Sequence, residues 1–205
     1  MVDPAGAVTQ VDALETLKLE LERFGAAHDA GAREPARRML NITRDTGEFL
    51  RFLMFAIAAR RMLEIGTSNG YSTLWLAEAA MRNGGLVTTI DADATKVAMA
   101  SSNFERSGLA SFISLKHEDA DLYLEQVGAG SFDAIFIDSD RARYLRWWPA
   151  IQRAIRTGGV IVVDNAMSHP TEVAQFIAVV HESRQFTTSL VPVGKGEFLA
   201  VRSVA

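Results

Sequence analysis

The sequence predicts an α/β fold in which helices cover both faces of a doubly wound, mostly parallel sheet. Three observations lead to this prediction. Short apolar runs alternate along the chain with longer amphipathic stretches, as in repeated strand–helix units. Several of the apolar runs end in acidic residues, which suits the ligand-binding edge of a parallel sheet. The last two runs are joined by a glycine-containing turn instead of a helix, which indicates an antiparallel hairpin.

The elements follow one another in a regular order. The expected parallel strands are Met62–Ile65, Leu86–Ile90, Phe112–Leu115, Ala134–Ile137 and Val160–Val163. The helices expected between them are Ser72–Met81, Ala94–Ser107, Ala120–Val127 and Arg143–Ile155. The hairpin consists of Thr187–Val193, Gly194-Lys195-Gly196 and Glu197–Arg202. Five parallel strands followed by a hairpin predict a sheet with one reversed strand near its edge.

The first 59 residues lack this alternation and predict a helical cap. Residues 1–10 have the pattern of a loose tail. An amphipathic helix follows, and its three–four spacing is carried by Leu14, Leu17, Leu21 and Phe24. A break is expected between Gly25 and Gly31, and further helices over Arg33–Leu40 and Thr46–Ala59. We expect one domain over residues 1–205, with the cap at 1–59 and the core at 60–205.

The composition is that of an ordinary globular protein, with 48% hydrophobic and 22% charged residues. A net charge of −4 gives no support for nonspecific binding to nucleic acid. The absence of cysteine excludes disulfides, thiolate metal sites and a cysteine nucleophile. The most apolar run, Phe49–Ala59, is interrupted by Arg51 and is too short to span a bilayer, and the N-terminus lacks a signal pattern. We therefore expect a soluble, cytoplasmic protein.

The turn after the first strand, Glu64–Ser72, has the features of a ligand-binding turn. Its glycines allow a ligand to approach the backbone, and the following helix offers free N–H groups. The Gly66-x-x-x-Gly70 spacing differs from the dinucleotide GxGxxG motif. Glu64 would repel a pyrophosphate and suits a ligand with an amino group or a cationic centre. A purely structural turn is the alternative.

Acidic residues also follow the second and third strands. Asp91 ends the second strand, where a carboxylate can accept from both hydroxyls of a ribose. Asp119 follows the third strand and could accept from an adenine amino group, although capping of the next helix explains this residue nearly as well. Asp93 fits a helix cap better than a ligand contact.

The fourth and fifth strands end in Asp138 and in Asp164-Asn165. Because the carboxyl ends of parallel strands meet at one edge of a sheet, we expect these side chains to converge. Two carboxylates and an amide oxygen are hard ligands suited to Mg²⁺, Ca²⁺ or Mn²⁺. Capping of loops and helices is again the alternative. His169, four residues after Asn165, is a candidate to face the same site.

Together these segments resemble the metal-dependent, catechol- and caffeoyl-CoA-type family of class I S-adenosylmethionine (SAM) O-methyltransferases. The resemblance runs from about Met39 to Arg202 and rests on three ordered motifs at Leu63–Thr73, Phe132–Tyr144 and Gly158–Asn165. It implies a Rossmann-like sheet of seven strands, the last of them antiparallel. It also implies methyl transfer from SAM to a hydroxyl oxygen of a small aromatic acceptor, assisted by a divalent metal such as Mg²⁺.

The resemblance assigns roles to individual residues. SAM would be held by Glu64, Gly66, Thr67, Ser72, Asp91, Ala92, Asp119, Ala120, Asp138 and Asp140, with Asn41 and Ile42 closing over its methionine end. The metal would be bound by Asp138, Asp164 and Asn165. Arg141 stands where the family commonly has a lysine base; arginine stays protonated, so it would stabilise charge instead of taking a proton. His169, water or the metal alone would then replace the base.

The acceptor does not transfer with the resemblance, because Ala166–Pro170 is short and lacks the family's Trp-Gly insertion. One alternative is methylation of a hydroxylated wobble uridine in tRNA. A phosphate track for it would consist of Arg33, Arg37, Arg38, Arg141, Arg143 and Arg146, although solvated helix faces explain these residues better in an acidic chain. A non-catalytic SAM-binding protein is the other alternative. The expected partners are a small hydroxylated acceptor and a second copy of the chain, without a membrane.

Overall fold

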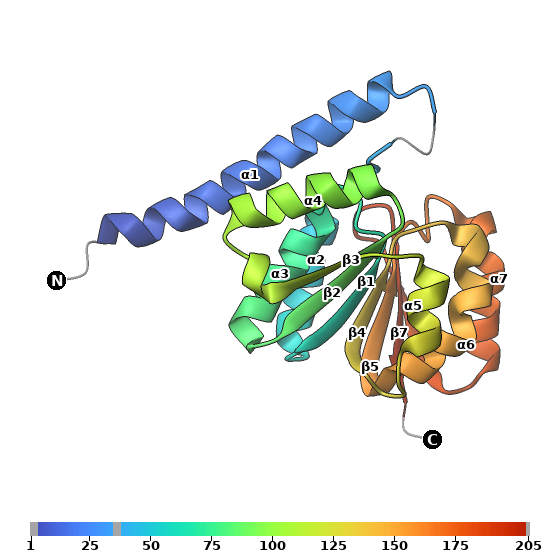
Figure 1. Ribbon diagram of the computed structural model, residues 1–205. Helices are drawn as coiled ribbons and strands as arrows, with labels where there is room; N and C mark the ends of the chain where they lie inside the picture. Colours follow the sequence, from blue (N-terminus) through green and yellow to red (C-terminus); the bar gives the residue numbers. More distant parts are fainter. Residues whose placement is uncertain (1–3, 35–37, 204–205) are drawn as a thin grey trace.

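The computed structural model describes residues 4–34 and 38–203, which form a seven-stranded sheet with helices on both faces (Figure 1). The strand order is β3-β2-β1-β4-β5-β7-β6. Strands β1 to β5 run parallel, and β7 is antiparallel to both of its neighbours, β5 and β6. The predicted doubly wound sheet with one reversed strand in a C-terminal hairpin is confirmed.

The strands are β1 (Arg61–Ile65), β2 (Leu86–Asp91), β3 (Ile113–His117), β4 (Phe132–Ile137), β5 (Ile155–Val163), β6 (Phe186–Val191) and β7 (Glu197–Arg202). The α-helices are α1 (Pro4–Gly31), α2 (Arg44–Ala56), α3 (Tyr71–Asn83), α4 (Ala94–Ser107), α5 (Ala120–Gln126), α6 (Tyr144–Ala154) and α7 (Pro170–Glu182). Short 3₁₀ turns are η2 (Ala110–Phe112) and η3 (Arg141–Arg143). None of the helices in the described ranges combines the length and the apolar character needed to cross a bilayer.

The sheet separates two hydrophobic cores. Helices α1 to α4 lie on one face and α5 to α7 on the other (Figure 1). Neighbouring residues of β4 belong to different cores, because Phe136 packs with the first set of helices and Ile135 with the second. Every residue of β4 is buried, which explains why the central strands read as continuous apolar runs in the sequence.

The N-terminal region differs from the expected cap. Residues from Pro4 belong to α1 instead of a loose tail, and Gly25 lies inside this helix instead of at a break. The helix expected over residues 33–40 is wrong: residues 33–34 and 38–40 are not helical, and residues 35–37 lie outside the described part. The reason is local, because Asp29 accepts from the backbone N–H groups of Met39 and Leu40 at 2.6 and 2.9 Å. The third expected helix ends at Ala56, since Ala58 adopts a positive φ of 50°.

Helix α7 was not expected from the sequence. Its sequence nevertheless contains common helix signals. Pro170 stands in the first turn, and the buried residues have three–four spacing at Val173, Phe176 and Val180. The helix covers the second core next to α6 (Figure 1). It also fixes the position of the loop between β5 and α7, where the predicted Asn165 and His169 lie.

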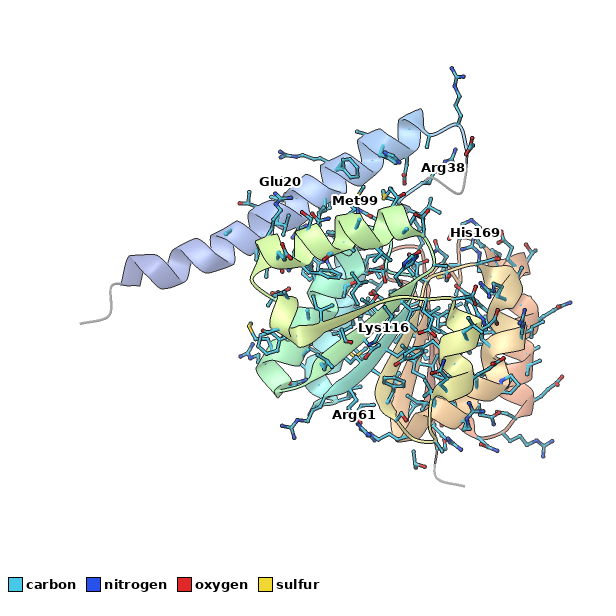
Figure 2. The ribbon with its side chains drawn as sticks, in the orientation of Figure 1. Glu20, Arg38, Arg61, Met99, Lys116 and His169 are labelled. Carbon is cyan, nitrogen blue, oxygen red and sulfur yellow. The ribbon has the colours of Figure 1, made fainter. Side chains whose placement is uncertain are left out.

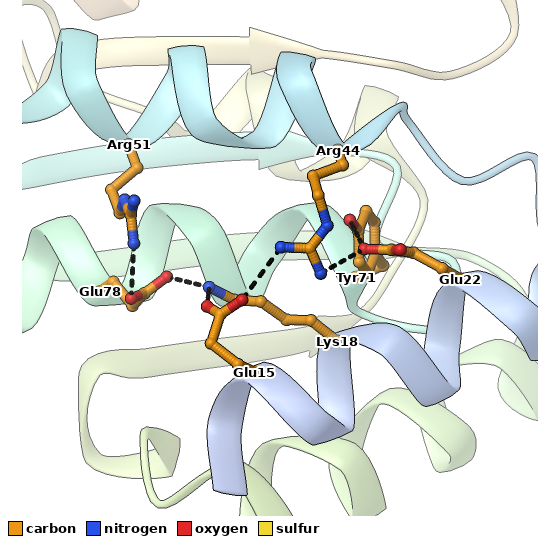
Figure 3. A network of polar contacts seen from close by, with 7 residues as sticks. All are labelled: Glu15, Lys18, Glu22, Arg44, Arg51, Tyr71 and Glu78. Carbon is orange, nitrogen blue, oxygen red and sulfur yellow. Dashed lines mark hydrogen bonds and ion pairs between the residues drawn. The ribbon is translucent and has the colours of Figure 1, made fainter. Parts of the chain in front are cut away.

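A buried ionic network attaches α1 to the rest of the molecule (Figure 3). Lys18 is fully buried, and its ammonium group lies 3.4 Å from the centroid of the Trp75 ring. The same group contacts Glu15 at 2.9 Å and also Glu78 of α3. The network extends through the pairs Arg44–Glu15, Arg44–Glu22 and Arg51–Glu78. Helix α1 is thus joined to α2 and α3 by alternating charges at their common junction.

We expect Lys18→Ala to lower the free energy of unfolding by about 3 kcal/mol, because it removes a fully buried cation together with its ion pairs to Glu15 and Glu78 and its contact with the Trp75 ring. Arg106→Ala is the matched control: its pair with Glu20 joins side chains that are 50% and 51% exposed, so the loss should stay below about 1 kcal/mol. Urea denaturation of both variants measures the difference. Equal midpoints for the two variants would show that Lys18 does not hold α1 in place.

Candidate active site

A cavity of about 440 Å³ opens at the carboxyl edge of the parallel strands. This volume is typical of small-molecule sites. The predicted residues on its wall are Asn41, Ile42, Gly66, Thr67, Ser72, Asp91, Asp138, Asp140, Arg141, Asn165 and His169. The remaining predicted residues, which do not line it, are Glu64, Ala92, Asp119, Ala120 and Asp164. Figure 2 shows His169 and Arg38 towards this end of the molecule and Arg61, the first residue of β1, at the opposite end.

The β1–α3 turn forms one wall of the cavity. Gly66 has a φ of 108°, and a Cβ at this position would collide with the carbonyl oxygen of Asp138. Only glycine therefore lets β1 and β4 end so close together. Ser68 also has a positive φ, 49°, and its backbone N–H donates to Asp91 at 2.8 Å. The turn leaves its backbone accessible on the cavity side, as the sequence predicted.

Glu64 lies directly beneath this turn and is fully buried. Its Oε2 accepts from the hydroxyls of Thr73 and Thr89, the latter at 2.5 Å, while its Oε1 has no partner. Burial raises the pKa of this carboxyl to about 7, against the hydrogen bonds that lower it. Glu64 is therefore placed below the cavity wall, with one oxygen unused.

The raised pKa of Glu64 predicts a pH-dependent stability. Below the unfolded-state pKa of 4.5, the protonated Glu64 carboxyl makes its full contribution to the free energy of unfolding. This contribution is lost as the pH rises through the folded-state pKa of about 7. Glu64→Gln stays neutral, so the variant should gain stability relative to the wild type between pH 5 and 8, by up to about 3 kcal/mol. Urea denaturation at several pH values measures this, with Glu105→Gln on the exposed side of α4 as control. Parallel stability curves for wild type and Glu64→Gln would contradict it.

Asp91 joins the turn to the N-terminal segment. Its Oδ2 accepts from Ser68 and its Oδ1 from the backbone N–H of Asp93 at 2.9 Å. The Ser68 hydroxyl in turn donates to the carbonyl of Met39 at 2.7 Å. A carboxylate has room for further donors beyond these two, so Asp91 can still accept from a ligand in the cavity. Asp93 caps α4, as the sequence indicated.

The contacts of Asp119 agree with the capping alternative. It is the N-cap of α5, accepting from the backbone N–H of Asp121 at 2.8 Å. It also pairs with Arg143 at 2.7 Å, and this guanidinium lowers the pKa of Asp119. With Asp119 engaged in this way and outside the cavity wall, a contact to an adenine amino group stays a prediction.

Asp138, Asp164 and Asn165 do converge at the carboxyl ends of β4 and β5. The Asn165 Nδ2 donates to Asp164 at 2.6 Å and to Asp138 at 3.3 Å. Burial and the neighbouring Asp164 raise the pKa of Asp138. Asn165 has a φ of 66°, so its amide reaches back between the two carboxyls. The amide N–H₂ group thus lies where the buried carboxyl of Asp164 meets the carboxyl of Asp138 on the cavity wall.

These three residues fit a hard cation after one rotation. Turning the Asn165 amide by half a turn places its Oδ1 beside both carboxyls, and its Nδ2 can then donate to Ser168, whose hydroxyl now lies 3.2 Å from Oδ1. Among the described residues, no three His, Cys, Asp or Glu side chains are grouped so that they could hold a metal. The amide oxygen is therefore required as the third protein ligand.

Two residues of the β6–β7 hairpin belong to this site and were missed from the sequence. Glu197 is fully buried, and the charge of Asp164 together with burial raises its pKa. Lys195 lines the cavity, and its positive charge opposes the rise in the pKa of Asp138 that burial and Asp164 cause. The sequence signal was the turn itself, since a hairpin returning beside β5 brings its charged residues to the carboxyl edge.

Arg141 and His169, the predicted catalytic residues, both lie on the cavity wall. The Arg141 Nε donates to Glu172 of α7 at 2.7 Å. The His169 Nδ1 lies 2.9 Å from the Ser168 hydroxyl. Arg141 therefore presents a guanidinium whose charge is partly balanced at the rim, and His169 lies on the loop that follows the acidic cluster.

A sheet of this topology with a ligand cavity at its carboxyl edge, between a glycine turn and an acidic cluster, defines the class I methyltransferase architecture. Residues 15–203 match the model of the O-methyltransferase family, and the chain belongs to this family.

Individual relatives agree with this membership. The chain is 37% identical over 131 residues to a catechol O-methyltransferase of Niastella koreensis, covering 62% of this chain and 59% of the relative. It is 40% identical over 129 residues to a catechol O-methyltransferase of Mycobacterium tuberculosis, covering 62% and 57%. The chain thus spans just under three fifths of the length of these curated relatives. The O-methyltransferase of Bacillus cereus in complex with S-adenosylhomocysteine (SAH) matches with a TM-score of 0.76 and 26% identity, covering 92% of this chain and 91% of that one.

Proposed function

We propose that the protein transfers a methyl group from SAM to a hydroxyl oxygen of a small aromatic acceptor, assisted by a divalent cation such as Mg²⁺. The observation that carries the proposal is the convergence of Asp138, Asp164 and Asn165 at the cavity, across from the β1–α3 turn. The bound SAH in the Bacillus cereus structure and the names of the catechol-type relatives support the donor and the acceptor class.

The cavity suits an adenosyl ligand with an amino acid portion. Gly66 presents backbone without a side chain, and Asp91 retains lone pairs for ribose hydroxyls. The unpaired Oε1 of Glu64 lies beneath the turn as an acceptor for an ammonium or amide donor. Asn41 and Ile42, which line the same cavity, would enclose the ligand. SAM would supply the methyl group, and these residues would orient it and exclude water.

The cluster formed by Asp138, Asp164 and Asn165 is suited to activate the acceptor hydroxyl. A cation held by Asp138, Asp164 and Asn165 would lower the pKa of an acceptor hydroxyl and make it a better nucleophile. Arg141 and Lys195, which line the same cavity, would stabilise negative charge on the acceptor oxygen. A protein base is then unnecessary, and His169 is the residue placed to act as one if the hydroxyl keeps its proton.

Three of the six arginines proposed as a tRNA phosphate track pair with carboxylates. Arg143 pairs with Asp119 and Asp121, and Arg146 pairs with Asp121. Arg141 pairs with Glu172. Arg37 lies outside the described residues. Three of the six cations are thus balanced within the fold, which favours a small acceptor over RNA.

Methyl transfer can be tested with radiolabelled SAM and a panel of catechols, phenylpropanoids and undermodified tRNA. We expect methylation of a small dihydroxylated aromatic acceptor that EDTA abolishes and Mg²⁺ restores. Asp164→Asn should lower the rate at least about 100-fold, because even residues outside a ligand set cost roughly 10- to 100-fold. Turnover that is unaffected by EDTA and by Asp164→Asn would rule out the metal, and methylation of tRNA alone would replace the small acceptor.

Arg141 is expected to act by its charge. Arg141→Ala should lower kcat roughly tenfold or more without moving the pH–rate profile, because a guanidinium does not titrate in the working range. Arg141→Lys should add a titration to the alkaline limb. Arg146→Ala, which removes a cation outside the cavity wall, is the matched control and should leave kcat unchanged. Unchanged kinetics in both Arg141 variants would place this residue outside the reacting centre.

A further inference from the structure

Gly25 is an unexpected residue for the interior of the long helix α1. It is buried, and glycine inside a helix is less favourable than alanine. Space explains its presence, because a Cβ at this position would lie 2.6 Å from the Nδ2 and 3.0 Å from the Cγ of Asn41. Gly31, the last residue of the same helix, has nothing within 4 Å of such an atom. Gly25 therefore marks a close approach between α1 and the segment that lines the cavity.

The side chain of Asn41 is docked on α1 at this point. Its Nδ2 donates to the carbonyl oxygen of Leu21 at 2.9 Å. Leu21 and Gly25 are four residues apart, so they lie on the same side of the helix. The Asn41 Oδ1 is buried and has no hydrogen-bond partner among the described residues. The single bond to Leu21 therefore decides the orientation of the amide.

The backbone beside Asn41 is strained and depends on its contacts with α1. Leu40 has a φ of 52°, which is disfavoured for a residue with a large side chain. Asp29, further along the same helix, accepts from the backbone N–H groups of Met39 and Leu40. Strained residues persist where the surrounding structure holds them, and they are common at ligand sites. Helix α1 thus holds residues 39–41 in a conformation that is costly without these contacts.

We propose that Gly25 is a positioning residue of the methyl-donor site: the absence of its side chain lets the Asn41 amide dock on α1 and so fixes the cavity wall formed by Asn41 and Ile42. This inference rests on the SAM of the proposed function and adds a residue outside the cavity wall. The three heavy atoms nearest to the Cβ position of Gly25, outside the helix backbone, all belong to Asn41. A methyl group there would displace the end of one side chain and leave the helix intact.

The test is the binding of SAH to the full-length protein, measured by isothermal titration calorimetry. Gly25→Ala should raise the dissociation constant roughly 3- to 10-fold, the effect of one lost hydrogen bond. Its urea midpoint should stay near that of wild type, because the higher helix propensity of alanine offsets the lost bond. Gly31→Ala is the matched control: it makes the same change in the same helix without meeting a neighbour. Its affinity for SAH should stay within about twofold of wild type.

A double-mutant cycle with Asn41→Ala separates positioning from a general effect on α1. Asn41→Ala should itself weaken SAH binding, and it removes the amide that a methyl group at position 25 would displace. Adding Gly25→Ala to it should therefore change the affinity no further. Additive losses in the two variants, or wild-type affinity of Gly25→Ala, overturn the role of Gly25 and leave the donor site in place. No binding of SAH by wild type overturns the donor itself and the positioning role with it.

The double variant also keeps the proposal testable if Gly25→Ala alone does not fold. Without the Asn41 amide there is room for the added methyl group, so the double variant should fold. A folded double variant with the SAH affinity of Asn41→Ala, weaker than that of wild type, supports the docking of Asn41 on α1. A double variant that fails to fold, or wild-type affinity of Asn41→Ala, overturns it.

Discussion

Four carboxyl groups at one edge of the sheet, three of them buried, are the constraint on which the rest of the site depends. Glu64, Asp138, Asp164 and Glu197 all lie at strand ends of β1, β4, β5 and β7, so the strand order itself brings them together. Removing carboxylates from water is costly unless each is hydrogen-bonded or paired with a positive group.

The hydrogen bonds to these acids are incomplete, and the missing partners point to a ligand. Threonine hydroxyls serve Glu64 and Glu197, and the amide of Asn165 serves both aspartates. One oxygen of Glu64 and one of Glu197 remain without a partner. A fold selected for stability alone would fill such positions with apolar side chains or complete their hydrogen bonds. The unfilled positions lie on either side of the Asp138 end of β4, where the donor and acceptor sites of a transfer reaction would meet.

Helices α1 and α2 and the segment between them are connected to the same edge of the sheet. Lys18 attaches α1 to α3, and Asp29 at the far end of α1 turns the chain back at Met39 and Leu40. The Ser68 hydroxyl then ties the Met39 carbonyl to the β1–α3 turn. Helix α2 adds a second connection through Thr46 and Glu197. The cavity wall at residues 38–42 is thus held by hydrogen bonds from Asp29 of α1 and from Ser68 of the β1–α3 turn.

The sequence predicted those elements of the fold that local residue patterns determine. Apolar runs gave the five parallel strands, and the turn at Gly194-Lys195-Gly196 gave the hairpin, because strand burial and turn geometry are written in neighbouring residues. The helix over 33–40 failed because Asp29, a residue of another element, takes the N–H groups that a helix would use. The sequence could not decide the role of Asp119, since a helix cap and a ligand contact need the same residue type. Its partner Arg143 lies on a distant segment.

Glu197 shows the limit most clearly. The turn predicts that β6 and β7 pair with each other, but it does not predict that β7 inserts between β5 and β6, so the place of Glu197 next to β5 is a non-local property of the strand order. The same insertion brings Lys195 to the cavity wall, which it shares with Arg141. The replacement of the family's lysine by Arg141 therefore does not leave the acidic cluster without an amine. A scaffold without chemistry would gain nothing from burying a further acid and placing a lysine at the same edge, so the pair of features favours an enzyme with cationic groups at two strand ends.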